Sequence, residues 1–170
     1  MNNFMKPNLY YKDIYSINYK KLKDNNISYL LFDIDNTIAD NLEKIPCQKA
    51  LDFITELKED FNIILISNSL PIRAKRFGTS LKVPYYSFSL KPFKKTYKKI
   101  IADFNLKTST IAAIGDQIYT DIKGANKMKI TSILVDRISD NESIITKFNR
   151  YRERILLNKY KIIERGKYDD

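Results

Sequence analysis

Two aspartates separated by one residue, Asp33 and Asp35, follow directly after the apolar run of residues 27–32. Carboxylates this close repel each other unless a cation lies between or near them. The sixth position of the loop that Asp33 begins is Ile38, where an EF-hand calcium loop requires glycine, so that kind of site is disfavoured. On these residues alone, an ordinary aspartate-rich turn remains the alternative.

Further polar residues follow later apolar runs. Carboxylates could hold a hard cation, and a lysine could receive an anion. Each residue alone also has a structural explanation as a turn residue, a solvated lysine or an acid at a helix N-terminus. The residues concerned are Ser67, Asn68, Lys91, Asp116 and Asp121.

The composition excludes several kinds of catalysis. The 170 residues include no histidine and one cysteine, Cys47. Ser-His-Asp and Cys-His catalysis are therefore excluded, as are disulfide frameworks and the zinc, haem and iron sites that need histidine or several cysteines. Catalysis must use carboxylates, hydroxyls, lysines and a hard cation with oxygen ligands.

Charge is distributed unevenly along the chain. The net charge is +10; residues 29–70 hold eight acidic and three basic residues, whereas residues 71–110 hold ten basic and one acidic. This alternation suits a site where carboxylates hold a cation and lysines receive an anion, and a basic protein favours anionic partners. Solvated helix faces are the alternative for most of these lysines.

The elements that must position these residues alternate between strands and helices. Short apolar runs predict strands, and apolar residues at helical spacing predict helices. Alternation of this kind predicts an α/β fold, a Rossmann-like parallel sheet of about five strands flanked by helices on both faces. The strands are expected at 27–32, 62–66, 83–88, 110–114 and 130–135, and the helices at 46–60, 71–77, 91–104, 119–128 and 143–165.

Ligands of such sheets bind beyond the carboxyl ends of the strands, near the point where the strand order reverses. Asp33, Ser67, Lys91 and Asp116 each follow, or lie near, the end of a predicted strand. We therefore expect these four side chains to meet at one edge of the sheet.

The motifs DIDNT, SNS, KP and GDQIYTD, in this order within residues 29–135, resemble the four motifs of haloacid dehalogenase-like (HAD) phosphatases. The resemblance implies that Asp33 is the nucleophile that forms an aspartyl-phosphate and also contributes to the metal site. Asp35 would be the general acid and then the base, and its backbone carbonyl would contact the metal. Thr37 would support the loop and belong to the phosphate-binding group.

The resemblance also implies roles for the later motifs. Ser67 would donate to the transferring phosphoryl oxygens, with the Asn68 amide beside it. Lys91 would pair with both the phosphoryl group and Asp33. Asp116 would complete a Mg²⁺ site, with Asp121 as a ligand or as an anchor behind it.

The spacing between motifs leaves no room for the cap domain of larger family members. Between Thr37 and Ser67 lie 29 residues, and between Ser67 and Lys91 lie 23, enough only for a core crossover. We expect one capless domain over residues 1–170. An open site excludes water poorly, so another subunit or a large substrate is expected to cover it.

The patterns DxDNT and GDQxxTD further resemble the YqeG-type, subfamily IIIA phosphatases, whose relatives include phosphatidylglycerophosphatases. That resemblance implies a lipid phosphate as substrate. The predicted helix 143–165 carries apolar and basic residues that suit an anionic membrane surface, or else packing on the sheet. With no signal peptide and no run of 18 apolar residues, a cytoplasmic location is expected, with peripheral contact at the inner face of the membrane as an option.

Two other functions remain open from the sequence. A phosphoacceptor module like a response-regulator receiver also uses an acidic cluster and a lysine, although the second carboxylate, Asp35, favours turnover over stable phosphorylation. A phosphatase of nucleic-acid ends would suit the basic stretch 71–110, but no sequence-reading motif is present, so sequence-specific nucleic-acid binding is not expected.

Overall fold

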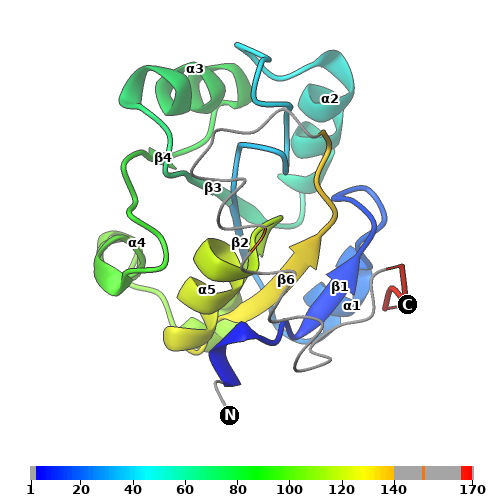
Figure 1. The fold of residues 1–170 in the computed structure, drawn as a ribbon, viewed down its shortest axis with the longest axis vertical. Coiled ribbons are helices and arrows are strands. Elements are labelled where there is room, and N and C mark those ends of the chain that lie inside the picture. The colour runs from blue at the N-terminus through cyan, green and yellow to red at the C-terminus, as the bar shows by residue number, and fades with distance from the viewer. Residues whose placement is uncertain (1–2, 140–150, 152–165, 170) are drawn as a thin grey trace.

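A computed structural model describes residues 3–139, 151 and 166–169 of the chain. Its centre is one sheet of six strands, all parallel, in the order β1-β6-β5-β2-β3-β4 (Figure 1). Most of the predicted helix 143–165 lies outside the described residues. The strands are β1 (Leu9–Tyr11), β2 (Tyr29–Phe32), β3 (Asn62–Ile66), β4 (Tyr85–Tyr86), β5 (Ile111–Gly115) and β6 (Thr131–Val135).

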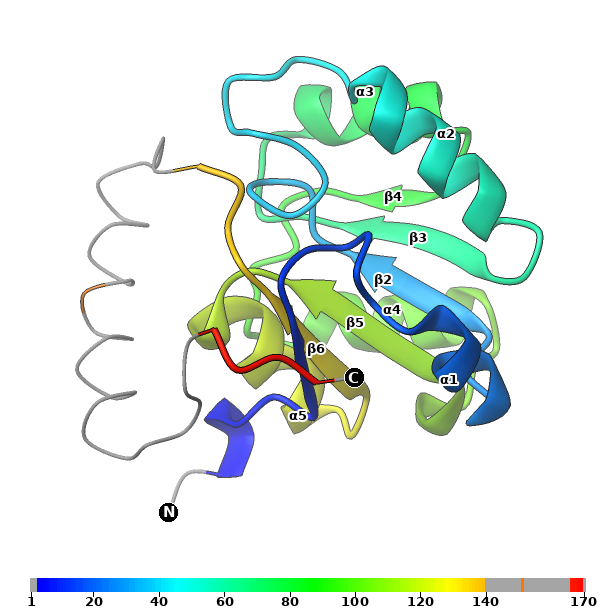
Figure 2. The ribbon, with the colours of Figure 1, turned by 90° about the vertical axis from the view of Figure 1, so that its right-hand side faces the viewer.

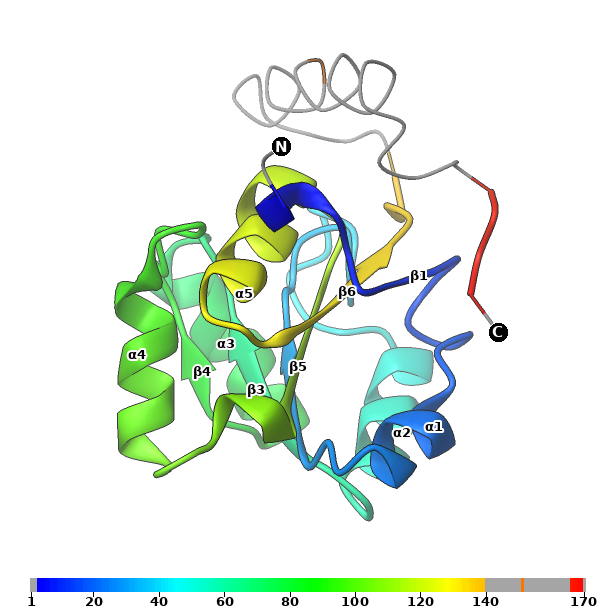
Figure 3. The same cartoon turned by 90° about the horizontal axis from the view of Figure 1, so that it is seen from below.

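Helices cover both faces of the sheet, as Figure 3 shows from below. Successive side chains of a strand point to opposite faces, so Leu30 and Phe32 of β2 pack with α1, α2 and α3, and Leu31 packs with α4 and α5. A sheet buried on both faces explains why its strands are continuous apolar runs. The helices are α1 (Tyr19–Asp24), α2 (Gln48–Leu57), α3 (Pro71–Leu81), α4 (Lys94–Asp103) and α5 (Lys123–Lys127), with 3₁₀ turns η1 (Asn3–Met5) and η2 (Thr108–Thr110) and a π-helical segment η3 (Ile118–Ile122).

The predicted fold class is confirmed, with differences at the edges. The sequence predicts about five strands, and the sixth is β1, which pairs with β6 through partners such as Leu9 and Ile133. Helix α3 continues to Leu81, beyond the predicted end at 77, and stops where Lys82 adopts a left-handed conformation. The single helix predicted over 119–128 is divided between η3 and α5.

The strand order reverses at the centre of the sheet. The chain passes from β2 to β3 and β4 on one side, then returns to place β5 and β6 on the other side of β2. In Figure 2 the arrowheads of β3, β4 and β5 point to the same edge, where the loops after the strands also lie. The ends of β2 and β5 therefore flank the position where a ligand is expected.

The described chain contains no inserted domain between the motifs. Only α2 and β3 separate Thr37 from Ser67, and only α3 and β4 separate Ser67 from Lys91. Over this part of the chain, the elements between the motifs are those of the core crossovers. Among the residues described, no helix combines the length and apolar character needed to cross a membrane.

Candidate active site

The ends of β2 and β5 bring together a buried group of ions. The Lys91 Nζ lies 2.6 Å from Asp33 Oδ1 and 2.6 Å from Asp121 Oδ1, and it donates to the Ile66 carbonyl at 2.9 Å. The Lys91 side chain is 2% exposed, and those of Asp33 and Asp121 are 6% and 4% exposed. Charges this deeply buried require partners, so the three residues form one electrostatic unit.

Carboxylates outnumber ammonium groups in and around this unit. Burial raises the pKa of the Asp33 carboxyl well above its usual value; Lys91 opposes that rise, and the carboxylates of Asp121, Asp35 and Asp116 add to it. Burial alone would lower the pKa of the Lys91 ammonium, but Asp121 and Asp33 reverse the effect and raise it, so Lys91 stays charged. An excess of carboxylate over ammonium favours binding of a cation.

Three carboxylates are placed to receive that cation. One oxygen each of Asp33, Asp116 and Asp121 lies within 4.8 Å of the other two, and all three residues are buried. Oxygen ligands with excess negative charge are the donor set that hard divalent ions such as Mg²⁺ prefer, so the residues fit a magnesium ion.

A glycine makes the third carboxylate possible. A Cβ atom on Gly115 would lie 2.3 Å from Asp121 Cγ, so only glycine lets this side chain approach the end of β5. Asp121 Oδ2 accepts from the Gln117 backbone N–H at 3.1 Å. The close approach and this hydrogen bond fix the Asp121 carboxylate against Lys91.

The loop after β2, which contains the first motif, forms a tight turn. Asn36 adopts a left-handed conformation, with φ of 58°, and its N–H donates to the Ala39 carbonyl at 2.8 Å. Asparagine tolerates this conformation better than other side chains, which explains its place in the motif. The Thr37 hydroxyl is buried and makes no hydrogen bond to any described residue.

The second carboxylate of the first motif is held by an arginine that the sequence analysis missed. Arg73 Nε of α3 lies 2.6 Å from Asp35 Oδ1. The same guanidinium donates to the carbonyls of Asp40, at 3.0 Å, and Glu43. Arg73 therefore fixes both Asp35 and the loop that follows the first motif, which no strand-end pattern could have indicated.

The SNS motif links the first and third motifs. The Ser67 hydroxyl donates to Asp35 Oδ2 at 3.4 Å and lies 2.9 Å from the Ser69 hydroxyl. Asn68 Oδ1 accepts from the Lys91 backbone N–H at 2.8 Å and from the Ser89 hydroxyl at 2.8 Å. The Asn68 side chain thus positions the loop that carries Lys91. For contact with a ligand, Asn68 has its backbone N–H.

The structure brings all eight predicted residues to the carboxyl edge of the sheet. Asp33, Asp116, Asp121 and Lys91 form the buried centre, and Asp35 lies beside them with a side chain 27% exposed. Thr37, Ser67 and Asn68 belong to the two loops around this centre. Arg73, Asn36 and Gly115 complete the arrangement and were not among the predicted residues.

Comparison with known proteins agrees with this arrangement. The profile of a family described as HAD-hydrolase-like matches residues 90–154. The chain is 30% identical over 162 residues to the probable phosphatase YqeG of Bacillus subtilis (strain 168), an alignment that covers 95% of this chain and 94% of that protein. The chain belongs to the HAD-like hydrolases. Within this family it is a YqeG-type protein.

Solved structures of low sequence identity share the fold. An uncharacterized protein from Listeria monocytogenes serotype 4b matches 78% of this chain and 99% of its own, with a TM-score of 0.54 and 15% identity. A HAD family enzyme from Bacteroides thetaiotaomicron, solved in complex with magnesium and inorganic phosphate, matches 68% of this chain and 98% of its own, with a TM-score of 0.55 and 13% identity. These matches support the same Rossmann-like architecture.

Proposed function

We propose that this YqeG-type protein is a Mg²⁺-dependent phosphomonoester hydrolase that works through an aspartyl-phosphate. The observation that carries the proposal is the buried contact of 2.6 Å between Lys91 Nζ and Asp33 Oδ1 at the reversal point of the sheet. A lysine in this position opposes the rise that burial causes in the pKa of the nucleophile, and it offsets negative charge that develops on the phosphoryl group.

In the first step, Asp33 Oδ2 attacks the phosphorus while Lys91 remains bound to Oδ1. The bond between phosphorus and the ester oxygen breaks, and Asp35 donates a proton to that oxygen, which leaves as an alcohol. The Ser67 hydroxyl and the Asn68 backbone N–H hold the phosphoryl oxygens, and Thr37 belongs to the loop that carries Asp33 and Asp35.

In the second step, water attacks the phosphorus of the aspartyl-phosphate. Asp35 takes a proton from this water, the bond between phosphorus and Asp33 breaks, and inorganic phosphate leaves. Arg73 holds the Asp35 side chain beside the site through its contact of 2.6 Å with Oδ1, so Oδ2 carries the proton that Asp35 donates in the first step and regains in the second.

Asp33, Asp116 and Asp121 would hold the Mg²⁺ that balances their charge. When bound, the ion supplies electrostatic stabilisation and orientation of the phosphoryl group. The magnesium and phosphate in the B. thetaiotaomicron HAD enzyme support this assignment.

We propose a lipid phosphate, such as phosphatidylglycerophosphate, as the substrate. The absence of a cap in the described chain leaves the site open to a large or surface-bound molecule, and the net charge of +10 favours an anionic surface. An enzyme with this substrate would work in the cytoplasm at the inner face of the membrane, as a monomer or an oligomer.

The test is phosphate release with Mg²⁺ from phosphatidylglycerophosphate in mixed micelles, and in parallel from a soluble aryl phosphate. Asp33→Asn is expected to lower both rates by at least about a thousandfold, and a chelator should abolish them. Asp103→Asn, which changes an exposed carboxylate on α4, is the matched control and should stay active.

Each alternative predicts a different result. If the protein hydrolyses the aryl phosphate but not the lipid phosphate, the proposed phosphatase chemistry is supported and the lipid is excluded as the substrate. Release of phosphate from 3′-phosphorylated DNA or RNA ends alone would favour the nucleic-acid substrate. A stable aspartyl-phosphate without turnover would favour the phosphoacceptor module.

A further inference from the structure

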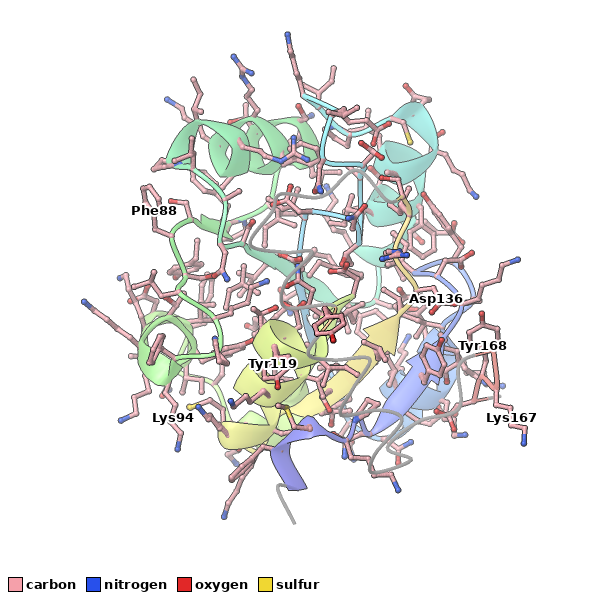
Figure 4. The ribbon with its side chains drawn as sticks, viewed as in Figure 1. Phe88, Lys94, Tyr119, Asp136, Lys167 and Tyr168 are labelled. Atoms are coloured by element: carbon pink, nitrogen blue, oxygen red, sulfur yellow. The ribbon has the colours of Figure 1, made fainter. Side chains whose placement is uncertain are left out.

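Large apolar side chains gather at the mouth of the candidate active site, exposed to solvent. They come from the loop after β2, the start of α3 and the loop between β4 and α4, and each is 54–74% exposed. Figure 4 shows one of them, Phe88, projecting outward from its loop. We call this group the apolar rim: Leu42, Ile45, Leu70, Ile72, Phe88, Leu90 and Phe93.

Hydrogen bonds join the three segments of the rim into one surface. Arg73, next to Ile72, donates to the Asp40 and Glu43 carbonyls, so it ties α3 to the loop that carries Leu42. The Phe88 backbone N–H donates to the Ser69 carbonyl at 3.2 Å. The three segments that carry the rim therefore lie next to one another beside the catalytic loops.

Local backbone chemistry favours polar residues at several rim positions, yet the chain has apolar ones. Leu70 and Phe93 are the N-cap residues of α3 and α4 and make no capping hydrogen bond with their side chains. Phe88 and Leu90 hold left-handed conformations, with φ of 44° and 51°, which asparagine tolerates better. Positions that contradict local preference on an exposed surface indicate a functional requirement for the apolar side chain.

Basic residues dominate around the rim, and the loop after β2 also carries the half-buried Asp40 and Glu43. Residues 61–102 contain no aspartate or glutamate. The basic residues exposed within or beside the rim segments are Lys44, Lys75, Arg76, Lys94 and Lys95. Apolar side chains bordered by ammonium and guanidinium groups are complementary to a lipid bilayer, which has a hydrocarbon interior and anionic headgroups at its surface.

We infer that the apolar rim is the surface by which this protein sits on an anionic lipid bilayer, with the mouth of the site facing the headgroups. This inference deepens the proposed function and rests on it for the statement that the substrate lies in that bilayer. The rim enters the interface between headgroups and acyl chains, the lysines contact lipid phosphates, and a phosphomonoester headgroup reaches Asp33 without leaving the membrane.

The test measures co-sedimentation of the full chain with vesicles of phosphatidylcholine, with or without an equal part of phosphatidylglycerol. The rim variant combines Leu70→Ser and Phe88→Asn, two changes that the local backbone favours. It is expected to bind anionic vesicles at least about tenfold more weakly than the native chain. Its melting temperature should be unchanged or higher, and it should hydrolyse a soluble aryl phosphate within about twofold of the native rate.

The matched control is Phe4→Ser, which removes an exposed aromatic residue from η1, an element far from α3 in Figure 1. This variant should bind vesicles like the native chain. Native binding should also require phosphatidylglycerol and weaken with salt.

The inference is overturned if the rim variant binds anionic vesicles as tightly as the native chain. It is also overturned if the native chain ignores vesicles but forms a dimer that the rim substitutions dissociate, because the rim is then a contact between copies. Hydrolysis of the aryl phosphate without vesicle binding would remove this inference alone. Vesicle binding through the rim without hydrolysis of any phosphomonoester would remove the proposed function alone.

Discussion

The contact of Arg73 with Asp35 is expected to affect how efficiently Asp35 transfers protons. Its guanidinium contacts three acceptors on two segments, and lysine cannot reach all three with one ammonium. We expect Arg73→Lys to lower kcat for an aryl phosphate by roughly tenfold to a hundredfold, and Arg73→Gln to lower it further, because a small displacement of a catalytic group is costly. KM should change less than kcat.

Steady-state kinetics on the two Arg73 variants will check this expectation. Arg76→Gln is the matched control, because Arg76 is exposed on the same helix. If Arg73→Gln keeps native kcat, the contact with Asp35 does not position the proton-transfer group.

Gly115 is the second residue whose effect is indirect. Alanine at this position would place its Cβ about where Asp121 now lies, 2.3 Å from Cγ. We expect Gly115→Ala to displace the Asp121 carboxylate, destabilise the fold by about 1–3 kcal/mol and weaken Mg²⁺ binding. Urea unfolding and Mg²⁺ titration would measure the two effects, and a variant with native stability and native Mg²⁺ affinity would contradict the steric argument.

At the scale of elements, the metal site joins the ends of β2 and β5 with η3. Because a cation binds the folded chain and balances three buried carboxylates, Mg²⁺ at about ten times its dissociation constant should stabilise the fold by about 1.4 kcal/mol. For a domain of this size we expect the melting temperature to rise by roughly 3–6 °C.

Differential scanning calorimetry with and without Mg²⁺ would measure this shift. Asp116→Asn should remove the shift, whereas Asp103→Asn should keep it, because Asp103 is exposed on α4 and outside the carboxylate group. An undiminished shift in the Asp116 variant would place the ion elsewhere.

The elements that the sequence predicted well are those with strong apolar patterns. The segments 62–66 and 130–135 form strands within one residue of the prediction, because each contains a short apolar run that is buried on both faces of the sheet. The convergence of Asp33, Ser67, Lys91 and Asp116 could likewise be predicted, because parallel strands end at a common edge.

The parts that were missed depend on contacts between distant segments. Strand β1 is three residues long, and its pairing with β6 spans 124 positions, so local periodicity could not indicate it. Arg73 lies on a helix between two motifs, and its function follows only from the way α3 packs beside the loop of Asp40 and Glu43. Gly115 belongs to the GDQIYTD motif, but the need for glycine there follows only from the close approach of the Asp121 side chain in the folded chain.

At the scale of the whole molecule, the end of the described chain returns to the outer side of β1 (Figure 3). Asp169 N–H donates to the Tyr10 carbonyl at 2.8 Å, and the Tyr10 N–H donates to Asp169 Oδ2 at 2.6 Å. The Tyr168 hydroxyl donates to Asp136 Oδ2 at 2.6 Å. These contacts cover a strand edge that would otherwise pair with other chains.

Deletion of residues 166–170 is therefore expected to lower stability by about 1–2 kcal/mol and to increase aggregation at moderate temperature. Thermal unfolding followed by light scattering would measure both, with Lys167→Ala as the control, since it keeps the backbone and the Tyr168 and Asp169 side chains. A truncated chain that stays monomeric and as stable as the native one would show that β1 needs no cover.

The pairing of β1 with β6 also sets an order of events during synthesis. Residues 9–11 leave the ribosome before the other five strands, and their partners at residues 133–135 follow 124 positions later. Strands β2, β3 and β4 are neighbours in both sequence and space, so they are able to assemble while the rest of the chain is still being made. The first strand of the sheet to be made can thus dock only after β6 has been made, and until then its apolar residues are available to chaperones.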